Sequence, residues 1–194
     1  MFKNTAGEKL RNLLNKIYDY RSSQEKILED DPTLLLGDVT SINATIIKGG
    51  TQENVIPPLY EVSVDIRLAV TVDHEKFEEL TRGWAKDSGD NIEVIFTTKE
   101  THCAPTAIDD SNIYWNAFKS AMDEMNLKIQ PQICPGSTDS SFIRAAGIKA
   151  IGFSPMNHTP ILLHDHDEYL HADVYLKGID IYEKLIERIA NVDG

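Results

Sequence analysis

The sequence has few of the features that mark secreted or membrane proteins. Its two cysteines, Cys103 and Cys134, lie far apart and form no Cys-x-x-Cys motif, which predicts reduced thiols in the core rather than a disulfide framework. No apolar run is long enough to span a bilayer. Met1 leads directly into a polar helical segment, which predicts that no cleaved leader is present. These features together predict a cytoplasmic protein.

Positive charge is also scarce, because 19 Lys and Arg face 31 Asp and Glu and the formal net charge is -12. Binding to nucleic acid or to an anionic membrane needs clusters of Lys and Arg, and the sequence has no basic run, so both kinds of partner are excluded. A Walker loop, a dinucleotide fingerprint and a Gly-x-Ser-x-Gly elbow are absent too. The length of 194 residues suits one full domain, or one small domain plus part of another.

The first half of the sequence alternates between helix and strand patterns. A capping box at Thr5–Glu8 opens a helix, and strands are predicted over 39–47 and 59–70. Asp73 caps a second helix, and a third strand is predicted over 91–98. This α-β-β-α-β order is that of a ferredoxin-like β-α-β-β-α-β unit without its first strand. We therefore expect an α+β fold whose first domain covers residues 1–103.

The second half, residues 104–194, has the pattern of an α/β domain. Helices are predicted from Asp110 or Ser111, from Thr138 to Gly147, and over 170–189, with strands over 127–133 and 148–153. Two strands make a poor sheet by themselves. This half is therefore interpreted as the C-terminal part of a larger catalytic domain.

The densest group of potential metal ligands is His164-Asp165-His166-Asp167-Glu168, followed by His171. Zinc binds imidazole nitrogen and carboxylate oxygen, so this run could supply ligands, and a self-contained site built from its three histidines is one hypothesis. The alternative is a solvated loop whose acidic residues favour the positive end of the last helix. The residues alone leave both interpretations open.

Two further candidates lie in the first half. Arg67 is on the polar face of the regular 59–70 strand, where it could be a surface partner of Asp65 or a guanidinium fork for a carboxylate or oxyanion. Asn54 follows Gly49-Gly50, in a stretch whose composition is equally typical of a turn. In the second half, Gly136, Thr138 and Asp139 could form an anion-binding loop, although an ordinary helix cap explains them as well.

Several of these segments together resemble one protein family. Gly49-Gly50, Asn54-Val55-Ile56-Pro57 and Asp65-Ile66-Arg67 resemble the lid signature of the two-zinc peptidase and amidohydrolase family. The segment Gly136-Ser137-Thr138-Asp139 resembles that family's Gly-Gly-Thr-Asp loop. The stretch from Gly152 to Glu168 is most similar to the cytosolic aminoacylases within the family.

The resemblance implies a fold, an activity and roles for particular residues. The ferredoxin-like domain would be a lid that also forms a homodimer, and Asn54 and Arg67 would bind substrate. His164 would be a ligand of one of two zinc ions. Water activated by zinc would split an N-acyl-L-amino acid into a carboxylate and a free L-amino acid.

The sequence also departs from the family pattern. The family's His-x-Asp motif, bridging aspartate and Glu-Glu pair with the general base have no counterpart in this chain, and Ser141 stands where relatives often carry arginine, while Arg144 is retained. Catalytic zinc usually takes three protein ligands, so His164 alone would not hold it. We therefore expect no catalytic residue in this chain, which would need a missing N-terminal half as partner. The alternative is a non-catalytic dimerisation or regulatory module.

Overall fold

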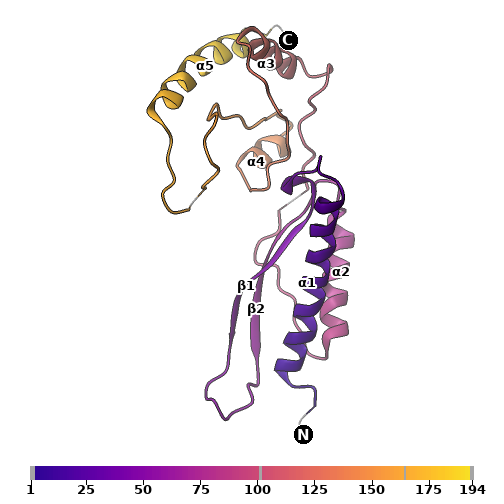
Figure 1. Cartoon of the computed structure of the whole chain (residues 1–194). Helices are drawn as coiled ribbons and strands as arrows, with labels where there is room; N and C mark the ends of the chain where they lie inside the picture. The colour runs from indigo at the N-terminus through magenta and orange to yellow at the C-terminus, as the bar shows by residue number, and fades with distance from the viewer. Residues whose placement is uncertain (1–2, 101, 164, 193–194) are drawn as a thin grey trace. The chain divides into compact units, whose positions relative to one another are not determined.

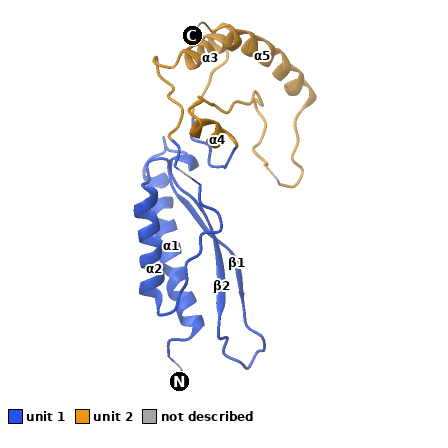
Figure 2. Ribbon diagram, turned by 180° about the vertical axis from the view of Figure 1, so that it is seen from behind, with its two compact units in different colours: residues 1–103, 132–138 blue, residues 104–131, 139–194 orange. Residues whose placement is uncertain are grey.

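The computed structural model describes residues 3–100, 102–163 and 165–192. The chain divides into two compact units, coloured separately in Figure 2. Unit 1 comprises Met1–Cys103 and Gln132–Thr138, and unit 2 comprises Ala104–Pro131 and Asp139–Gly194. Within the described ranges, no helix has the length and apolar character needed to cross a membrane. The predicted division into domains 1–103 and 104–194 stays a prediction.

Two capped helices form one side of unit 1 (Figure 1). Helix α1 spans Ala6–Asp30 and begins with the predicted capping box, in which Thr5 accepts from the Glu8 amide and the Glu8 carboxylate accepts from the Thr5 amide. Helix α2 spans His74–Ser88, and the Asp73 carboxylate accepts from the amides of Glu75 and Lys76. Both predicted helix starts are therefore confirmed.

Two antiparallel strands form a hairpin next to α1. Strand β1 spans Ser41–Gly49 and β2 spans Tyr60–Arg67, with a short 3-10 turn, η1, at Leu36–Asp38 before them. A bulge between Ala44 and Ile46 shifts the register of β1, so the regular alternation expected for it is interrupted. On the inner face Ile42 is almost fully buried, and Phe77 and Trp84 of α2 contact the ring of Tyr20 at centroid distances of 5.5 Å.

The predicted third strand over 91–98 is wrong for the described structure. Among the described residues β1 and β2 pair only with each other, and Ile95 is 70% exposed. Phe96 instead packs on α2, where the Arg82 guanidinium lies 5.1 Å from its ring centroid. A strand needs hydrogen bonds from a neighbouring strand, and alternation of side chains does not supply them. Unit 1 therefore has the order α-β-β-α, and the ferredoxin-like arrangement stays a prediction.

Three helices organise unit 2. Helix α3 spans Ile113–Glu124, α4 spans Ser140–Ala145 and α5 spans Ala172–Ala190. The N-cap of α3 is Asn112, rather than Asp110 or Ser111 as expected, because Asp109 accepts from both the amide and the hydroxyl of Ser111 in a local turn. The N-cap of α4 is Asp139 rather than Thr138.

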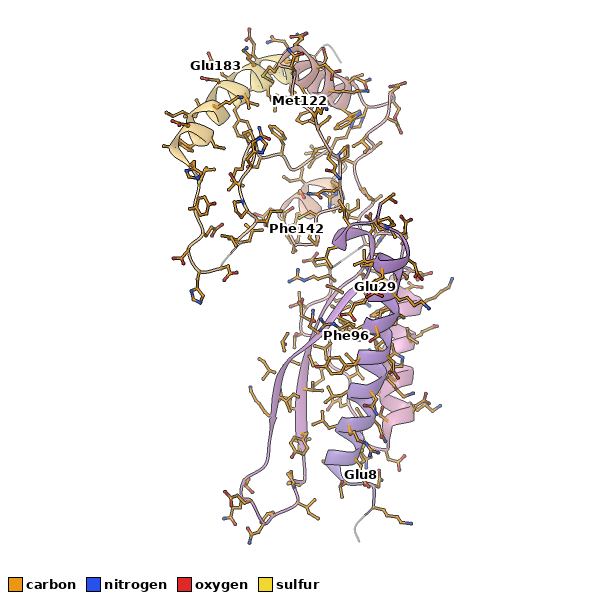
Figure 3. The ribbon with its side chains drawn as sticks, in the orientation of Figure 1. Glu8, Glu29, Phe96, Met122, Phe142 and Glu183 are labelled. Atoms are coloured by element: carbon orange, nitrogen blue, oxygen red, sulfur yellow. The ribbon has the colours of Figure 1, made fainter. Side chains whose placement is uncertain are left out.

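The core of unit 2 lies between α3 and α5. Trp115, Phe118 and Met122 of α3 pack with Ile181 and Leu185 of α5, and Figure 3 labels Met122, which is 1% exposed. The strands predicted over 127–133 and 148–153 are absent from the described residues, where neither segment has a paired strand. The fold of the chain is therefore mixed α and β, with a two-stranded antiparallel sheet in its described part.

Candidate functional site

The loop that carries Asn54 is shaped by two glycines at the end of β1. A Cβ at Gly49 would lie 2.3 Å from the Tyr60 ring, and Gly50 has a φ of +83°, which favours glycine. The loop and the start of α1 surround a hollow of about 370 Å³. Its lining residues are Thr5, Gly7, Glu53, Asn54, Val55, Ile56, Pro57 and Tyr60. Asn54 is exposed there and accessible to a ligand.

Arg67 is the last residue of β2 and pairs in register with Ser41. Its Nε lies 3.1 Å from the Oδ2 of Asp65, and its side chain is 46% exposed. An exposed ion pair of this kind contributes under about 1 kcal/mol to stability. This contact engages one of the five N–H donors of a guanidinium, and the exposure lets a carboxylate approach from solvent.

The structure does not bring Asn54 and Arg67 together within one chain. Arg67 is at the end of β2 that pairs with the start of β1, whereas Asn54 lies in the loop beyond the other end of the hairpin (Figure 1). At about 3.3 Å per residue, the strand from Tyr60 to Arg67 alone spans roughly 23 Å. That span exceeds the length of an N-acyl amino acid, so one copy of the chain cannot present both side chains to the same substrate molecule.

The loop with Gly136 and Thr138 belongs to unit 1, and the segment just before it packs closely within that unit. The Ile133 carbonyl approaches Gly37 so closely that a Cβ at Gly37 would lie 2.0 Å from its oxygen. The Ser137 hydroxyl donates to the Glu100 carboxylate at 2.7 Å. A carboxylate beside this loop disfavours a bound anion, and Asp139 is an N-cap whose side chain makes no cap hydrogen bond. An anion-binding role for the loop stays a prediction.

His164, the predicted metal ligand, lies outside the described residues. Nearby, the His166 amide donates to its neighbour Asp165 at 2.7 Å, and His171 is the N-cap of α5 with its ring 5.2 Å from that of Tyr169. Across the described part of the chain, no three His, Cys, Asp or Glu side chains are grouped closely enough to hold a metal ion. The described residues therefore do not fit a zinc site by themselves.

A pair of histidines in unit 1, His74 and His102, was not identified in the sequence analysis. The rings of His74 and His102 meet edge to face with centroids 4.9 Å apart. Burial lowers the pKa of His74 from its usual 6.5, and the nearby His102 and Lys99 lower it further, while Asp73 opposes them. No local pattern links the two positions, because the contact forms only when the chain after α2 folds back along that helix.

Comparison with known proteins decides the family. The model of the Peptidase family M20/M25/M40 matches residues 15–188. The chain belongs to this family. Aminoacylase-1 of Homo sapiens is 44% identical over 190 residues, which are 98% of this chain and 47% of that protein. Aminoacylase-1 of Dictyostelium discoideum is 38% identical over 200 residues, covering 97% of this chain and 48% of that relative.

More distant proteins match as well. A probable succinyl-diaminopimelate desuccinylase of Staphylococcus aureus is 25% identical over 166 residues, 82% of this chain and 39% of that protein. A crystal structure of an M20 family metallo-carboxypeptidase from Sulfolobus solfataricus shares the fold, with a TM-score of 0.55 and 19% identity. That likeness covers 97% of this chain and 46% of the carboxypeptidase chain.

These comparisons confirm the resemblance to aminoacylases that the sequence motifs indicated, and they place the likeness in the C-terminal half. The chain spans about half the length of the curated relatives that it matches, 47% in the case of human Aminoacylase-1. The M20 assignment therefore concerns the matched residues, and the activity of a whole relative is a separate question.

Proposed function

We propose that this M20 chain supplies the lid and the C-terminal part of the catalytic domain of an aminoacylase. The whole enzyme would hydrolyse N-acyl-L-amino acids to a carboxylate and a free L-amino acid. The observation that carries this proposal is the 44% identity to human Aminoacylase-1 across 98% of the chain. The proposed lid is a ferredoxin-like domain, and the helices and hairpin of unit 1 are consistent with most of its elements.

Within that enzyme, Arg67 would bind the negative charge of the substrate. A guanidinium presents a planar fork of donors that matches a carboxylate, and it can equally stabilise the oxyanion that forms when water attacks the amide. Its place on the polar face of β2, exposed and held on one side by Asp65, supports this role. Asp65 would orient the fork without blocking it.

Asn54 and Arg67 of the same chain would contact two different substrate molecules. The two side chains are separated by more than the length of the hairpin strand, roughly 23 Å. In a homodimer formed through the lid, the Asn54 loop of one copy could reach the substrate held by the other copy. The separation estimated from the length of β2 supports this division of roles.

Zinc and the general base would be supplied mostly by polypeptide outside this chain, with His164 as one ligand. The described residues do not form a metal site, and one ligand is too few for catalytic zinc. Apart from His164, the metal ligands and the base would therefore belong to residues that this chain does not contain. What this chain contributes is the binding and orientation of the substrate.

The lack of a metal site among the described residues also supports a second candidate function, which is a dimerisation or regulatory module without catalysis. Such a module would keep the lid contacts but would need neither His164 nor Arg67. The two functions can be distinguished by fusing this chain to the N-terminal half of a relative, which is the half that this chain does not match.

The test is to fuse the N-terminal half of human Aminoacylase-1 to this chain and to measure hydrolysis of N-acetylmethionine with zinc present. We expect turnover by the fusion. Arg67→Ala in the fusion should lower kcat/KM by about 100-fold or more, as loss of an oxyanion donor does, and Arg67→Lys should restore only part of it. Arg82→Ala, a control on α2, should retain activity. An inactive but folded fusion would favour the regulatory module.

A further inference from the structure

The two cysteines of the chain lie in two segments that unit 1 brings together. Cys103 ends the long segment of unit 1, and Cys134 lies in its second segment, Gln132–Thr138. Both side chains carry thiols, and Cys134 is exposed whereas Cys103 is half-buried. The prediction of thiols in the core is therefore wrong for Cys134, whose sulfur is accessible to a reagent in solution.

One hydrogen bond joins the two segments. The Ser137 hydroxyl donates to the Glu100 carboxylate at 2.7 Å. With ordinary covalent geometry, this bond limits the distance between the two Cα atoms to about 10 Å. Cys103 lies three residues after Glu100, and Cys134 lies three residues before Ser137. In segments that run in opposite directions, two such positions face each other.

The first segment runs along α2 toward the start of that helix. The Lys99 ammonium pairs with Glu78, one turn into α2. Three residues further along, the ring of His102 lies 4.9 Å from that of His74, the first residue of α2. Cys103 follows His102 directly, so it lies next to the start of α2.

The second segment reaches the same end of unit 1. The Ile133 carbonyl is so close to Gly37 that a Cβ there would lie 2.0 Å from its oxygen. Gly37 stands three residues before Thr40, whose hydroxyl accepts from the Ala69 amide at 3.1 Å in the connection between β2 and α2. Cys134 follows Ile133 directly. Both cysteines therefore lie at the end of unit 1 where α2 begins.

We propose that Cys103 and Cys134 form a reversible dithiol–disulfide pair that a hydroperoxide oxidises. A disulfide needs Cα atoms about 4.4–6.8 Å apart. Facing positions of two antiparallel segments meet this requirement, because their Cα atoms lie roughly 4.5–5.5 Å apart. The pair belongs to unit 1 alone, and it does not depend on the proposed function.

The oxidation is balanced by the peroxide. The exposed thiolate of Cys134 attacks one peroxide oxygen, the O–O bond breaks, and the products are a sulfenic acid and hydroxide. The Cys103 thiolate then attacks the sulfenic sulfur and a second hydroxide leaves as the S–S bond forms. The two hydroxides take up the two protons that the thiols released. The two thiols together lose two electrons, and the hydroperoxide is reduced.

The disulfide would join two places where the chain passes between the units. The chain leaves unit 1 after Cys103 and returns to it at Gln132. The bond would therefore close a loop over residues 104–133, which contains α3. Closing such a loop restricts the unfolded chain, so the oxidised form should unfold at a higher temperature than the reduced form.

The experiment is to treat the purified 194-residue chain with hydrogen peroxide, to alkylate the remaining thiols and to analyse peptides by mass spectrometry. We expect a monomer in which Cys103 is cross-linked to Cys134, a Tm raised by several degrees, and reversal of both by dithiothreitol. Cys103→Ser should leave a sulfenic acid at Cys134 that dimedone labels. Cys134→Ser should be labelled several-fold less, because the remaining thiol is half-buried.

A variant of the joining hydrogen bond tests the geometry. Ser137→Ala removes the donor to Glu100 and should slow the cross-linking by about threefold or more. The matched control is Ser22→Ala on the exposed face of α1, which should cross-link at the rate of the wild type.

Three results would overturn the proposal. The first is a peroxide-treated wild type in which both cysteines are alkylated or separately oxidised. The second is a product that contains disulfide-linked dimers and no cross-link within one chain. The third is cross-linking that proceeds as fast in urea, or in Ser137→Ala, as in the folded wild type, because the fold would then contribute nothing to the pairing.

Discussion

At the scale of single residues, the partial burial of His74 and its contact with His102 make stability depend on pH. Because the pKa of His74 is lowered in the folded chain, mainly by burial and then by His102, the folded state favours the neutral ring. The unfolded chain binds more protons between the lowered pKa and the usual 6.5. The stability that this group contributes is therefore complete above pH 6.5 and is lost as the pH falls through that window.

Replacement of His102 tests this account. In His102→Asn we expect the pKa of His74, followed by NMR titration of its ring protons, to rise toward the usual value without reaching it, because burial remains. In His74→Asn the loss of stability with falling pH should be smaller than in the wild type. A His158→Asn variant, altered in the other unit, should leave the titration of His74 unchanged. An identical pKa of His74 with and without His102 would contradict the account.

The residue scale also shows the limit of prediction for the candidate site. Period-two alternation predicted that Arg67 lies on the polar face of a strand. The structure confirms this, because Arg67 is exposed on β2 and pairs with Asp65 on the same face. Alternation assigns a face and gives no distance to a residue in a loop, so the separation of Arg67 from Asn54 was not foreseen. The contact of His74 with His102 was missed for the same reason, since it depends on tertiary folding.

At the scale of elements, the caps of α1 and α2 are the local features that fix where each helix begins. Asp73→Ala removes the acceptor for the amides of Glu75 and Lys76, at 3.0 and 3.1 Å. We expect the free energy of unfolding of unit 1 to fall by about 1 kcal/mol, the usual contribution of such a cap. Urea titration followed by the fluorescence of Trp84 measures it.

The control for the cap is Asp90→Ala. The backbone carbonyl of Asp90, rather than its side chain, accepts from Lys9, so this variant should change stability by only a few tenths of a kcal/mol. Equal stability of the Asp73 variant and the wild type would show that the start of α2 is held by packing alone.

Elements differ in how far the sequence predicts them. Helix starts were predictable where one side chain accepts a hydrogen bond from a backbone amide in the first turn, as at Thr5 and Asp73. The start of α3 at Asn112 was misplaced by one or two residues, because a turn just before it uses the side chain of Asp109. Both strands of the hairpin were predicted from their side-chain patterns, and they can pair with each other because they are neighbours in sequence. The apolar segments 91–98, 127–133 and 148–153 have strand patterns without strand structure, since ladder hydrogen bonds must come from other segments.

At the scale of the whole molecule, Asn54 and Arg67 are proposed to bind substrate, and His164 is proposed as one metal ligand of an M20 enzyme. The chain's match to about half of human Aminoacylase-1 supports this division, and its described residues contain no metal-binding group of their own. A second source of ligands and of the base is therefore central to the proposal. The proposed homodimer would form through the lid.

The most direct test is to add zinc to the purified 194-residue chain alone and to follow the release of methionine from N-acetylmethionine. The account predicts no release above that of a sample without protein, together with weak zinc binding, because one ligand cannot hold the ion. Turnover by the isolated chain that a metal chelator abolishes would contradict the account, since the chain would then contain a complete active site.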